Sequence, residues 1–406
     1  METVIYLDYA ATTPMRSEVA EAMLPYLTEH FGNPSSAYSI ARTTKQAVGN
    51  ARKIIAESIG ASENEIYFTS GGTESDNWAL KSSFVSARSQ KDEGCHIITD
   101  NIEHHAILHS CKALEHEGCE VTYIPVDDTG RVNPALVEQA IKANTVLISV
   151  MLANNEIGTI QPIKEISDIA HKNGILLHVD AVQAYAHMPI DVNAMGIDMM
   201  SASSHKFYGP KGAGFLYIRK NALTEPLLHG GAQENQMRAG TENVASIVGM
   251  GAAAKLAAAE LLEEEDRERR LRDYFIDRIQ TEIPYTRLNG AYGKERLANN
   301  INISFQFIES ESLLIMLDMK GICVSAGSAC ATGSKEPSHV LTAIGLPPEL
   351  ANGSIRFTLG RYTSKEELDT VIDIVKEAVG SLREVSFQYE NYIKSQQLGE
   401  NRRLLY

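Results

Sequence analysis

The sequence predicts an α/β protein with a large, mostly parallel sheet domain and a smaller α+β domain. Between about residues 65 and 220, short apolar runs alternate with helical segments, which is typical of a parallel sheet covered by helices on both faces. The chain has 406 residues, too many for one hydrophobic core. We therefore expect a large domain over 15–262, a small domain formed by 1–14 plus 263–388, and a C-terminal tail over 389–406.

The composition is that of an ordinary globular enzyme with an acidic surface. The formal net charge of −15 argues against nucleic acid or an anionic membrane as a broad-surface partner. No segment reads as a membrane span of about 18 apolar residues, and the N-terminus lacks the pattern of a signal peptide. The five cysteines show no disulfide framework. These features predict reduced thiols and a cytoplasmic location.

The elements can be assigned in order from apolar periodicity and turn residues. We expect a short N-terminal strand, a helix over 36–60, and a strand at 214–218 whose direction the sequence leaves open. A long helix with a charged, solvated face should link the domains. Near the end, Ser364 and Glu367 form a capping box for a helix with an apolar stripe. The last residues, 389–406, are expected to be a loose tail.

A lysine in a short polar loop is the first candidate functional residue. Lys206 lies in the run SSHKFYGPKGAG, residues 203–214, between hydroxyl residues and a Gly/Pro turn. Such a loop can hold a lysine for Schiff-base chemistry. Taken alone, a lysine near Gly and Pro would instead be interpreted as a surface residue of a turn.

An aspartate stands where the preceding apolar strand ends. Asp180 follows the run 175–179, at the sheet edge where ligands bind in open α/β sheets. A carboxylate there can keep a pyridine nitrogen protonated, although an Asp in this place is also a common cap or turn residue. Asp180 and Lys206 are 26 positions apart, enough for one helix and one strand. Together they are typical of a pyridoxal phosphate enzyme, and the chain resembles the fold-type-I aminotransferase superfamily.

Polar residues follow two other strands. The strand at 65–70 runs into Gly71, Gly72 and Thr73 before a helix, an arrangement that suits a phosphate, with a capped tight turn as the alternative. Asn154 and Asn155 follow the strand that begins at residue 145. Their amides could bind a phenolic oxygen or a substrate carboxylate, or merely shape a turn.

Histidines and cysteines after residue 104 raise a metal site as a rival idea. His105, His109 and His116 are expected on one helix, close to Cys111 and Cys119. The spacing lacks the paired ligands of a zinc site. We therefore expect no metal, and we place His105 and His109, four positions apart, on a solvated helical face.

The sharpest signal is a cysteine among small residues. Cys330 lies in SAGSACATGS, residues 325–334, where Gly, Ala and Ser favour a mobile, exposed loop. Cys323, between Ile and Val, is expected to be a buried strand residue. An isolated loop cysteine could equally be an oxidation liability without a role.

Several segments narrow the resemblance. The runs LDYAATTP, GNPSS, SAGSAC, EPSHVL and SIRFTLGR resemble the NifS/IscS-like cysteine desulfurases of the class-V aminotransferase family, in the group with a long active-site loop. The likeness covers nearly the whole chain. It implies a sheet of the seven-stranded type, bound pyridoxal 5'-phosphate and an obligate homodimer.

The resemblance also implies roles for individual residues. Lys206 would bind the cofactor and move the α-proton, His104 would stack on the ring and relay protons, and Arg356 would anchor the substrate carboxylate, with Asn155 nearby. Arg361 is the competing anchor, and a structural ion pair remains an alternative for Arg356. The residues implied to contact the ring or the phosphate are Gly72, Thr73, His104, Asn155, Asp180, Gln183, Ser203, His205, Lys206 and Thr241 of the partner subunit.

The implied reaction converts L-cysteine to L-alanine. The Cys330 thiolate would take the sulfur as a persulfide and pass it to an acceptor protein for iron-sulfur cluster assembly, tRNA thiolation or both. Two alternatives stay open: another reaction on the same scaffold, such as a selenocysteine lyase or an aminotransferase, and a non-catalytic regulator that binds pyridoxal phosphate.

Overall fold

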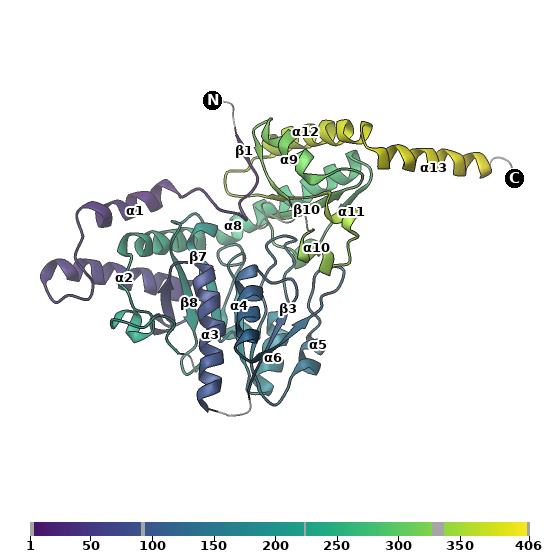
Figure 1. The fold of residues 1–406 in the computed structure, drawn as a ribbon. Coiled ribbons are helices and arrows are strands. Elements are labelled where there is room, and N and C mark those ends of the chain that lie inside the picture. Colours follow the sequence, from purple (N-terminus) through teal and green to yellow (C-terminus); the bar gives the residue numbers. More distant parts are fainter. Residues whose placement is uncertain (1–3, 91–93, 223–224, 327–336, 404–406) are drawn as a thin grey trace.

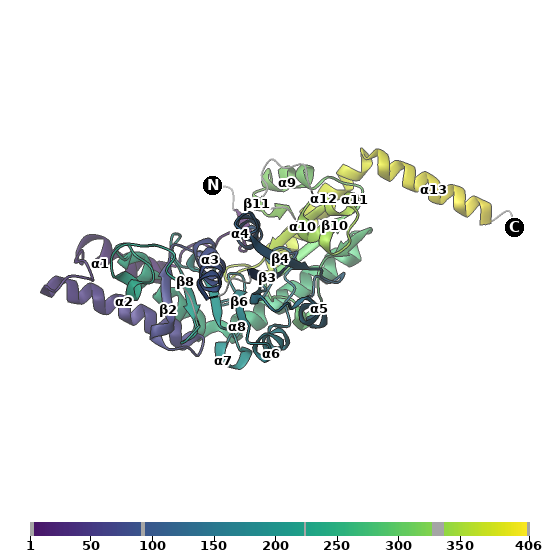
Figure 2. The same ribbon diagram turned by 60° about the horizontal axis from the view of Figure 1, so that its bottom comes forward.

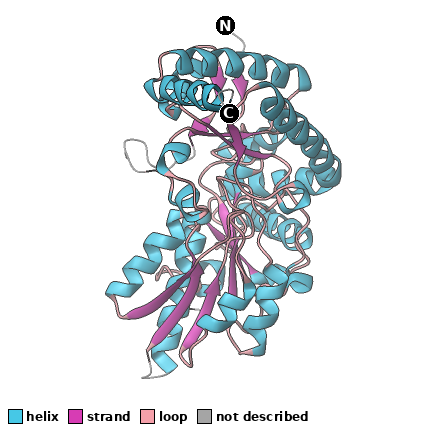
Figure 3. Ribbon diagram, turned by 90° about the vertical axis from the view of Figure 1, so that its right-hand side faces the viewer, coloured by secondary structure: helices cyan, strands magenta, loops and turns pink. Residues whose placement is uncertain are grey.

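The computed structural model describes residues 4–90, 94–222, 225–326 and 337–403. A seven-stranded sheet forms the centre of the larger part, with helices on both faces (Figure 3). The strand order is β2-β8-β7-β6-β5-β3-β4. Its strands are β2 (Ile66–Thr69), β3 (Cys95–Asp100), β4 (Cys119–Ile124), β5 (Thr145–Ser149), β6 (Leu176–Asp180), β7 (Met199–Ser203) and β8 (Gly214–Ile218).

The sheet is parallel except at one strand. β8 runs antiparallel to both β2 and β7, which settles the direction that the sequence left open. Every other pairing is parallel, so β3, β5, β6 and β7 place their carboxyl ends at one edge. The helices of this part are α1 (Ser17–Thr28), α2 (Ser39–Ser58), α3 (Gly72–Gln90), α4 (His105–His116), α5 (Pro134–Ala140), α6 (Ile163–Lys172) and α7 (Val192–Met195).

The smaller part is built on an antiparallel sheet of order β12-β13-β10-β9. The N-terminal strand β1 (Ile5–Tyr6) joins this part, because it pairs in parallel with β11 (Ile322–Cys323). Cys323 is therefore a strand residue as expected, but it is half-buried. The remaining elements are β9 (Thr286–Leu288), β10 (Asn300–Phe305), β12 (Ser325–Ala326), β13 (Ser354–Thr358), α9 (Ser310–Asp318), α10 (His339–Ala343), α11 (Pro348–Ala351) and α12 (Lys365–Glu384).

One helix, α8 (Val244–Glu282), joins the two parts (Figure 1). Its first half packs on α1 and α2 and contributes Met250 and Ala254 to the large core, and its second half contributes Phe275 and Ile279 to the small one. By length and composition alone, α8 is long and apolar enough to cross a membrane. This finding corrects the expectation that no segment of the chain approaches the length and apolarity of a membrane span. Its apolar window is 44% buried within the protein.

The C-terminal tail differs from the prediction. Up to Arg403 it forms a helix, α13 (Phe387–Arg403), which projects from the rest of the chain in Figures 1 and 2. Tyr389 and Tyr392 pack against the rings of Tyr285 and Phe307, with ring centroids 5.0–6.2 Å apart. These contacts across the sequence anchor the first turns, and no local pattern of residues 389–406 reveals them.

Candidate active site

A cavity of about 600 Å³ lies at the carboxyl ends of the parallel strands. Residues from the N-terminal segment, the start of α3, the loop before α4 and the small sheet line it. The predicted site residues in its wall are Gly72, Thr73, His104, Asn155, Asp180, Gln183, Ser203, His205, Lys206 and Arg356. Strands and loops that are far apart in the sequence are thus brought to a single pocket.

Lys206 ends a single 3-10 turn, Ser204–Lys206, directly after β7. Its Nζ donates to the Ala10 carbonyl oxygen at 2.6 Å and to that of Ala11 at 3.0 Å. The Gln183 amide also donates to Ala10 O, at 3.0 Å. From the sequence, this N-terminal segment contributed only to the family resemblance. Backbone carbonyls have no side-chain signature, so the contact with Lys206 was missed.

Asp180 is the last residue of β6, buried in the cavity floor. Burial raises the pKa of Asp180 to about 6, although the Val182 N–H, 2.8 Å from Oδ1, and the nearby Lys206 cation both favour the carboxylate. A cationic ring nitrogen against this carboxylate would supply the charge partner that a buried acid needs. The position fits a protonated pyridine.

Three more carboxyl groups are buried near Asp180, and the sequence did not single them out. Burial raises the pKa of Asp100 to about 7 and holds those of Asp76 and Glu103 well above their usual range, with the Asp180 charge adding to each shift. Among the described residues, one oxygen of each of these three has no hydrogen-bond partner. Among the described residues, the buried His178 has a nitrogen 3.8 Å from Asp76 Oδ1, within ion-pair distance.

His104 caps the N-terminus of α4 and faces the cavity. Its Nδ1 accepts a hydrogen bond from the Ala106 N–H at 3.1 Å, so the proton of the neutral ring is on Nε2. Burial, and secondly the Lys206 cation, lower the pKa of His104 to about 4. At neutral pH this side chain is an uncharged ring, suited to stacking on an aromatic cofactor.

The start of α3 forms a cradle for an anion. A Cβ on Gly72 would lie 2.5 Å from Val182 Cγ2, so only glycine leaves the backbone room to approach the wall of the cavity here. The N-terminus of this 19-residue helix opens into the pocket beside Thr73, Ser203 and His205. Backbone N–H groups and hydroxyls of this kind suit a phosphate.

The two candidate arginines occupy different places. Arg356 on β13 lines the cavity, where Nη2 lies 2.9 Å from Asp8 Oδ1 and Nη1 donates to the Asn155 carbonyl oxygen at 2.9 Å. Its buried Nε has no hydrogen-bond partner among the described residues, so a donor is left for an anionic ligand. A structural ion pair, the alternative role for Arg356, therefore accounts for Nη2 but not for Nε.

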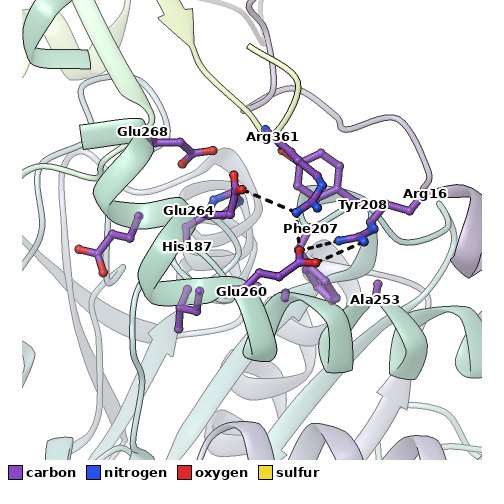
Figure 4. A pocket seen from close by; sticks show the side chains of 13 residues that line it. Arg16, His187, Phe207, Tyr208, Ala253, Glu260, Glu264, Glu268 and Arg361 are labelled. Carbon is purple, nitrogen blue, oxygen red and sulfur yellow. Dashed lines mark hydrogen bonds and ion pairs between the residues drawn. The ribbon is translucent and has the colours of Figure 1, made fainter. Parts of the chain in front are cut away.

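Arg361 lies beyond the end of β13 and points away from the cavity. Figure 4 shows it with Glu260 and Glu264 of α8, and Glu260 also binds Arg16. The Tyr208 hydroxyl, behind the Lys206 loop, accepts from the Arg361 N–H at 2.7 Å. The structure therefore favours Arg356 as the residue available to a ligand.

The paired asparagines divide their roles. Asn154 shapes the turn, since its Oδ1 accepts from the N–H groups of Glu156 and Ile157 and its Nδ2 donates to the Ile102 carbonyl oxygen. Asn155 is the one that lines the cavity. Asn154 therefore has the turn-shaping role, and Asn155 is the asparagine placed to bind a ligand.

The histidines of α4 differ in their surroundings. His109 and His116 are exposed, but His105 is half-buried and packs between the rings of His109 and His339, at 4.9 and 4.8 Å. The solvated face expected of His105 and His109 holds for His109 but not for His105. No group of three potential metal ligands converges within the described parts of the chain.

Two predicted residues are not in the pocket as described. Thr241 is exposed and lies outside the wall of this chain's cavity. Cys330 falls outside the described residues, and the described segments on either side of it contact residues in or next to the cavity wall. Ser325 pairs with Arg356 across β12 and β13, and Ser338 donates to Glu156, next to Asn155, at 2.5 Å.

Comparison with known proteins agrees with this geometry. The family model of class-V aminotransferases matches residues 5–371. The cysteine desulfurase IscS of Methanosarcina thermophila is 57% identical over 94% of this chain and 93% of its own length. The chain belongs to the cysteine desulfurases of the class-V aminotransferase family. Enzymes of this family depend on pyridoxal phosphate, and the donors around the cavity fit that cofactor.

Solved structures of related desulfurase-like proteins share the fold. A NifS-like protein superposes with a TM-score of 0.87 at 36% identity, covering 93% of this chain and all of its own. The structure of SspA in complex with cysteine has a TM-score of 0.78 at 37% identity, covering 89% of this chain and all of its own. The predicted fold class, family and cofactor are therefore confirmed.

Proposed function

We propose that this desulfurase converts L-cysteine to L-alanine and passes the sulfur, as a persulfide on Cys330, to an acceptor protein. The observation that carries the proposal is the convergence of Lys206, Asp180, His104 and Arg356 on one cavity. When bound, pyridoxal phosphate supplies an electron sink that makes the α-proton of an amino acid acidic.

The charged and neutral side chains of the cavity would have different roles in the reaction. Arg356 would bind the substrate carboxylate through its available Nε–H and so orient the amino acid. Lys206 would carry the α-proton, and Asp180 would hold the ring-nitrogen proton in place. Gln183 would bond the phenolic oxygen, and the neutral His104 would lie against the ring and relay a proton to the leaving group.

Cys330 would then attack the substrate sulfur. Support comes from the neighbouring segments: Ser325 pairs with Arg356 of the cavity wall, and Ser338 is bonded to Glu156, next to Asn155 of the wall. A covalent carrier suits this chemistry because free sulfide would diffuse away and react without selectivity. The same thiol would deliver sulfur to acceptors for iron-sulfur cluster assembly, tRNA thiolation or both.

We also propose that the enzyme is a cytoplasmic homodimer. Thr241 is exposed and is not part of its own chain's cavity wall, and Arg238 of the same segment is fixed by Glu74 of α3 at 2.8 Å. In the dimer, Thr241 of the partner subunit would complete the phosphate site. We keep the domain limits of 15–262 and 1–14 plus 263–388, because residues 5–7 share one core cluster with residues 275–379.

The test measures both products and the sulfur carrier. Purified enzyme receives L-cysteine, and alanine and the mass of the Cys330 peptide are followed with and without a thiol reductant. We expect alanine and, before reduction, one additional sulfur atom on that peptide. Cys330→Ser should abolish desulfuration, whereas the matched variant Cys323→Ser should retain it. Alanine formation that survives Cys330→Ser would favour a lyase that needs no carrier, and transamination without sulfur release would favour an aminotransferase.

A further inference from the structure

Two buried thiols lie against each other at the opposite end of the large sheet from the cavity. Cys95 and Cys119 are the first residues of β3 and β4 and stand directly opposite in the parallel register. Their Sγ atoms are 3.5 Å apart, with the Cys119 thiol directed at the Cys95 sulfur. Neither residue lines the cavity, and the proposed reaction uses neither.

The strand register is compatible with a disulfide. Neighbouring strands lie about 4.8 Å apart, and bridged cysteines have Cα atoms separated by about 4.4–6.8 Å. Because the two cysteines are paired in register, closing the remaining gap between the sulfur atoms needs only side-chain rotation. The strands would not have to move apart or slip.

The pair lies just beneath the surface. The residue fractions exposed are 2% for Cys95 and 5% for Cys119, yet the adjacent Gly94, Gly118 and Glu120 are all exposed. β4 is also the edge strand of the sheet. A small oxidant therefore has a short path to the thiols through the strand ends.

The two sulfurs are chemically unequal. The hydrogen bond from the Cys119 thiol lowers the pKa of Cys95, so Cys95 is the better nucleophile. The third thiol of this core, Cys111 on α4, is buried, and burial raises its pKa to about 12. Reaction at Cys111 is correspondingly disfavoured.

We propose that Cys95 and Cys119 form a redox-modification site that a small peroxide oxidises to a disulfide. The Cys95 sulfur attacks one oxygen of hydrogen peroxide, the O–O bond breaks, and a sulfenic acid and water result. The Cys119 sulfur then attacks the Cys95 sulfur, and the sulfenic oxygen leaves as a second water. In all, two thiols lose two protons and two electrons, and one peroxide becomes two waters.

The cross-link would enclose the unit that presents His104 to the cavity. Between the two cysteines the chain contains the rest of β3, the loop with His104, and α4. A disulfide would close this segment into a ring and restrict its local unfolding. The oxidised form should therefore hold α4 and β4 more firmly than the reduced form does.

The first test counts thiols in the Cys330→Ala protein, which retains four of the five cysteines. Reduced, folded protein is exposed to hydrogen peroxide, denatured and alkylated. We expect loss of two alkylatable thiols, recovery with dithiothreitol, and linkage of the tryptic peptides 92–112 and 113–131. Adding Cys111→Ser should preserve the link, which assigns it to Cys95, and adding Cys95→Ser should abolish it.

Hydrogen–deuterium exchange provides a second readout. Amide exchange across α4 and β4 should slow by about tenfold on oxidation, and this effect should disappear in the Cys95→Ser protein. If that variant fails to fold, the linked peptides from the protein that keeps Cys95 decide the question. Four thiols left intact in the folded protein, under conditions that oxidise the unfolded chain, would overturn the proposal, as would a link that maps to Cys111.

Discussion

Arg356 on β13 and Asp8 near the N-terminus are bound to each other at 2.9 Å inside the candidate site. Asp8 also accepts a hydrogen bond from the Ser325 hydroxyl at 2.9 Å. Both terminal nitrogens of the guanidinium are thus engaged, by Asn155 and Asp8, while its buried Nε has no hydrogen-bond partner among the described residues. A substrate carboxylate is the partner that we propose for this donor.

Replacement of this arginine tests the anchor. Arg356→Lys removes the planar donor pair, and we expect the KM for L-cysteine to rise by about 10- to 100-fold, with a smaller change in kcat. Asp8→Asn should raise KM less, because it loosens the guanidinium without removing it. Arg361→Lys is the control, since Arg361 binds Glu260 and Glu264 instead. Equal effects in the two arginine variants would contradict the assignment.

Replacing Lys206 and replacing Lys211, both in the described cavity wall, should affect activity and cofactor attachment very differently. Lys206→Ala should abolish activity and the borohydride-stable attachment of the cofactor to the peptide. Lys211→Ala removes a cation from the same wall, yet it should keep that attachment and most of the activity. Absorbance of the protein-bound cofactor and peptide mass after borohydride treatment report the attachment in each variant. Cofactor still covalently attached to the chain in Lys206→Ala would contradict the assignment of Lys206.

A buried glutamate on α8 predicts a pH dependence of stability. Burial raises the pKa of Glu268 from 4.5 to about 8. The folded state therefore binds this proton more tightly than the unfolded state, and Glu268 makes the free energy of unfolding fall as pH rises from about 4.5 to 8.

Glu268→Gln should remove this decrease in the free energy of unfolding with rising pH. Relative to the parent, the variant should gain stability between pH 5 and pH 8, by an amount on the order of a few kcal/mol. Denaturant unfolding at the two pH values measures it. The exposed Glu263→Gln on the same helix should leave the pH profile unchanged. A Glu268→Gln profile parallel to that of the parent would refute the shift.

The aromatic cluster at the start of α13 predicts how this helix is held. Tyr392→Ala removes ring contacts at 5.0 and 5.3 Å with Phe307 and Tyr285. We expect amide exchange over residues 387–396 to accelerate by about tenfold, which corresponds to about 1–2 kcal/mol. The exposed Gln396→Ala should have no such effect. Unchanged exchange in Tyr392→Ala would show that the rings do not anchor the helix.

Local patterns predicted much of this molecule. The Ser364–Glu367 capping box forms at the start of α12, and the residues placed at strand ends from chain order alone meet in the cavity. Residues beside a strand end are determined by topology, which apolar periodicity reveals. The described residues that the resemblance assigns to the cofactor or the substrate in this chain all line the cavity, while their roles stay predictions, as do those of Thr241 and Cys330.

The remaining features depend on contacts that no local pattern encodes. α13 is a helix whose rings meet Tyr285 and Phe307 far upstream, and Lys206 is bound by the backbone of Ala10 and Ala11. The acids near Asp180 come from α3, β3 and the following loop, so their proximity appears only once the sheet is assembled. Long-range proximity of this kind needs three-dimensional structure.

The pairing of β1 with β11 has a consequence for biosynthesis. When β1 leaves the ribosome, its partner at residues 322 and 323 is still more than 300 positions from being synthesised. At translation speeds of about 5–20 residues per second, this strand waits roughly 15 to 60 s before its neighbour exists. The segment that follows β1, including the carbonyls of Ala10 and Ala11 that contact Lys206, should therefore be among the last of the described parts to fold.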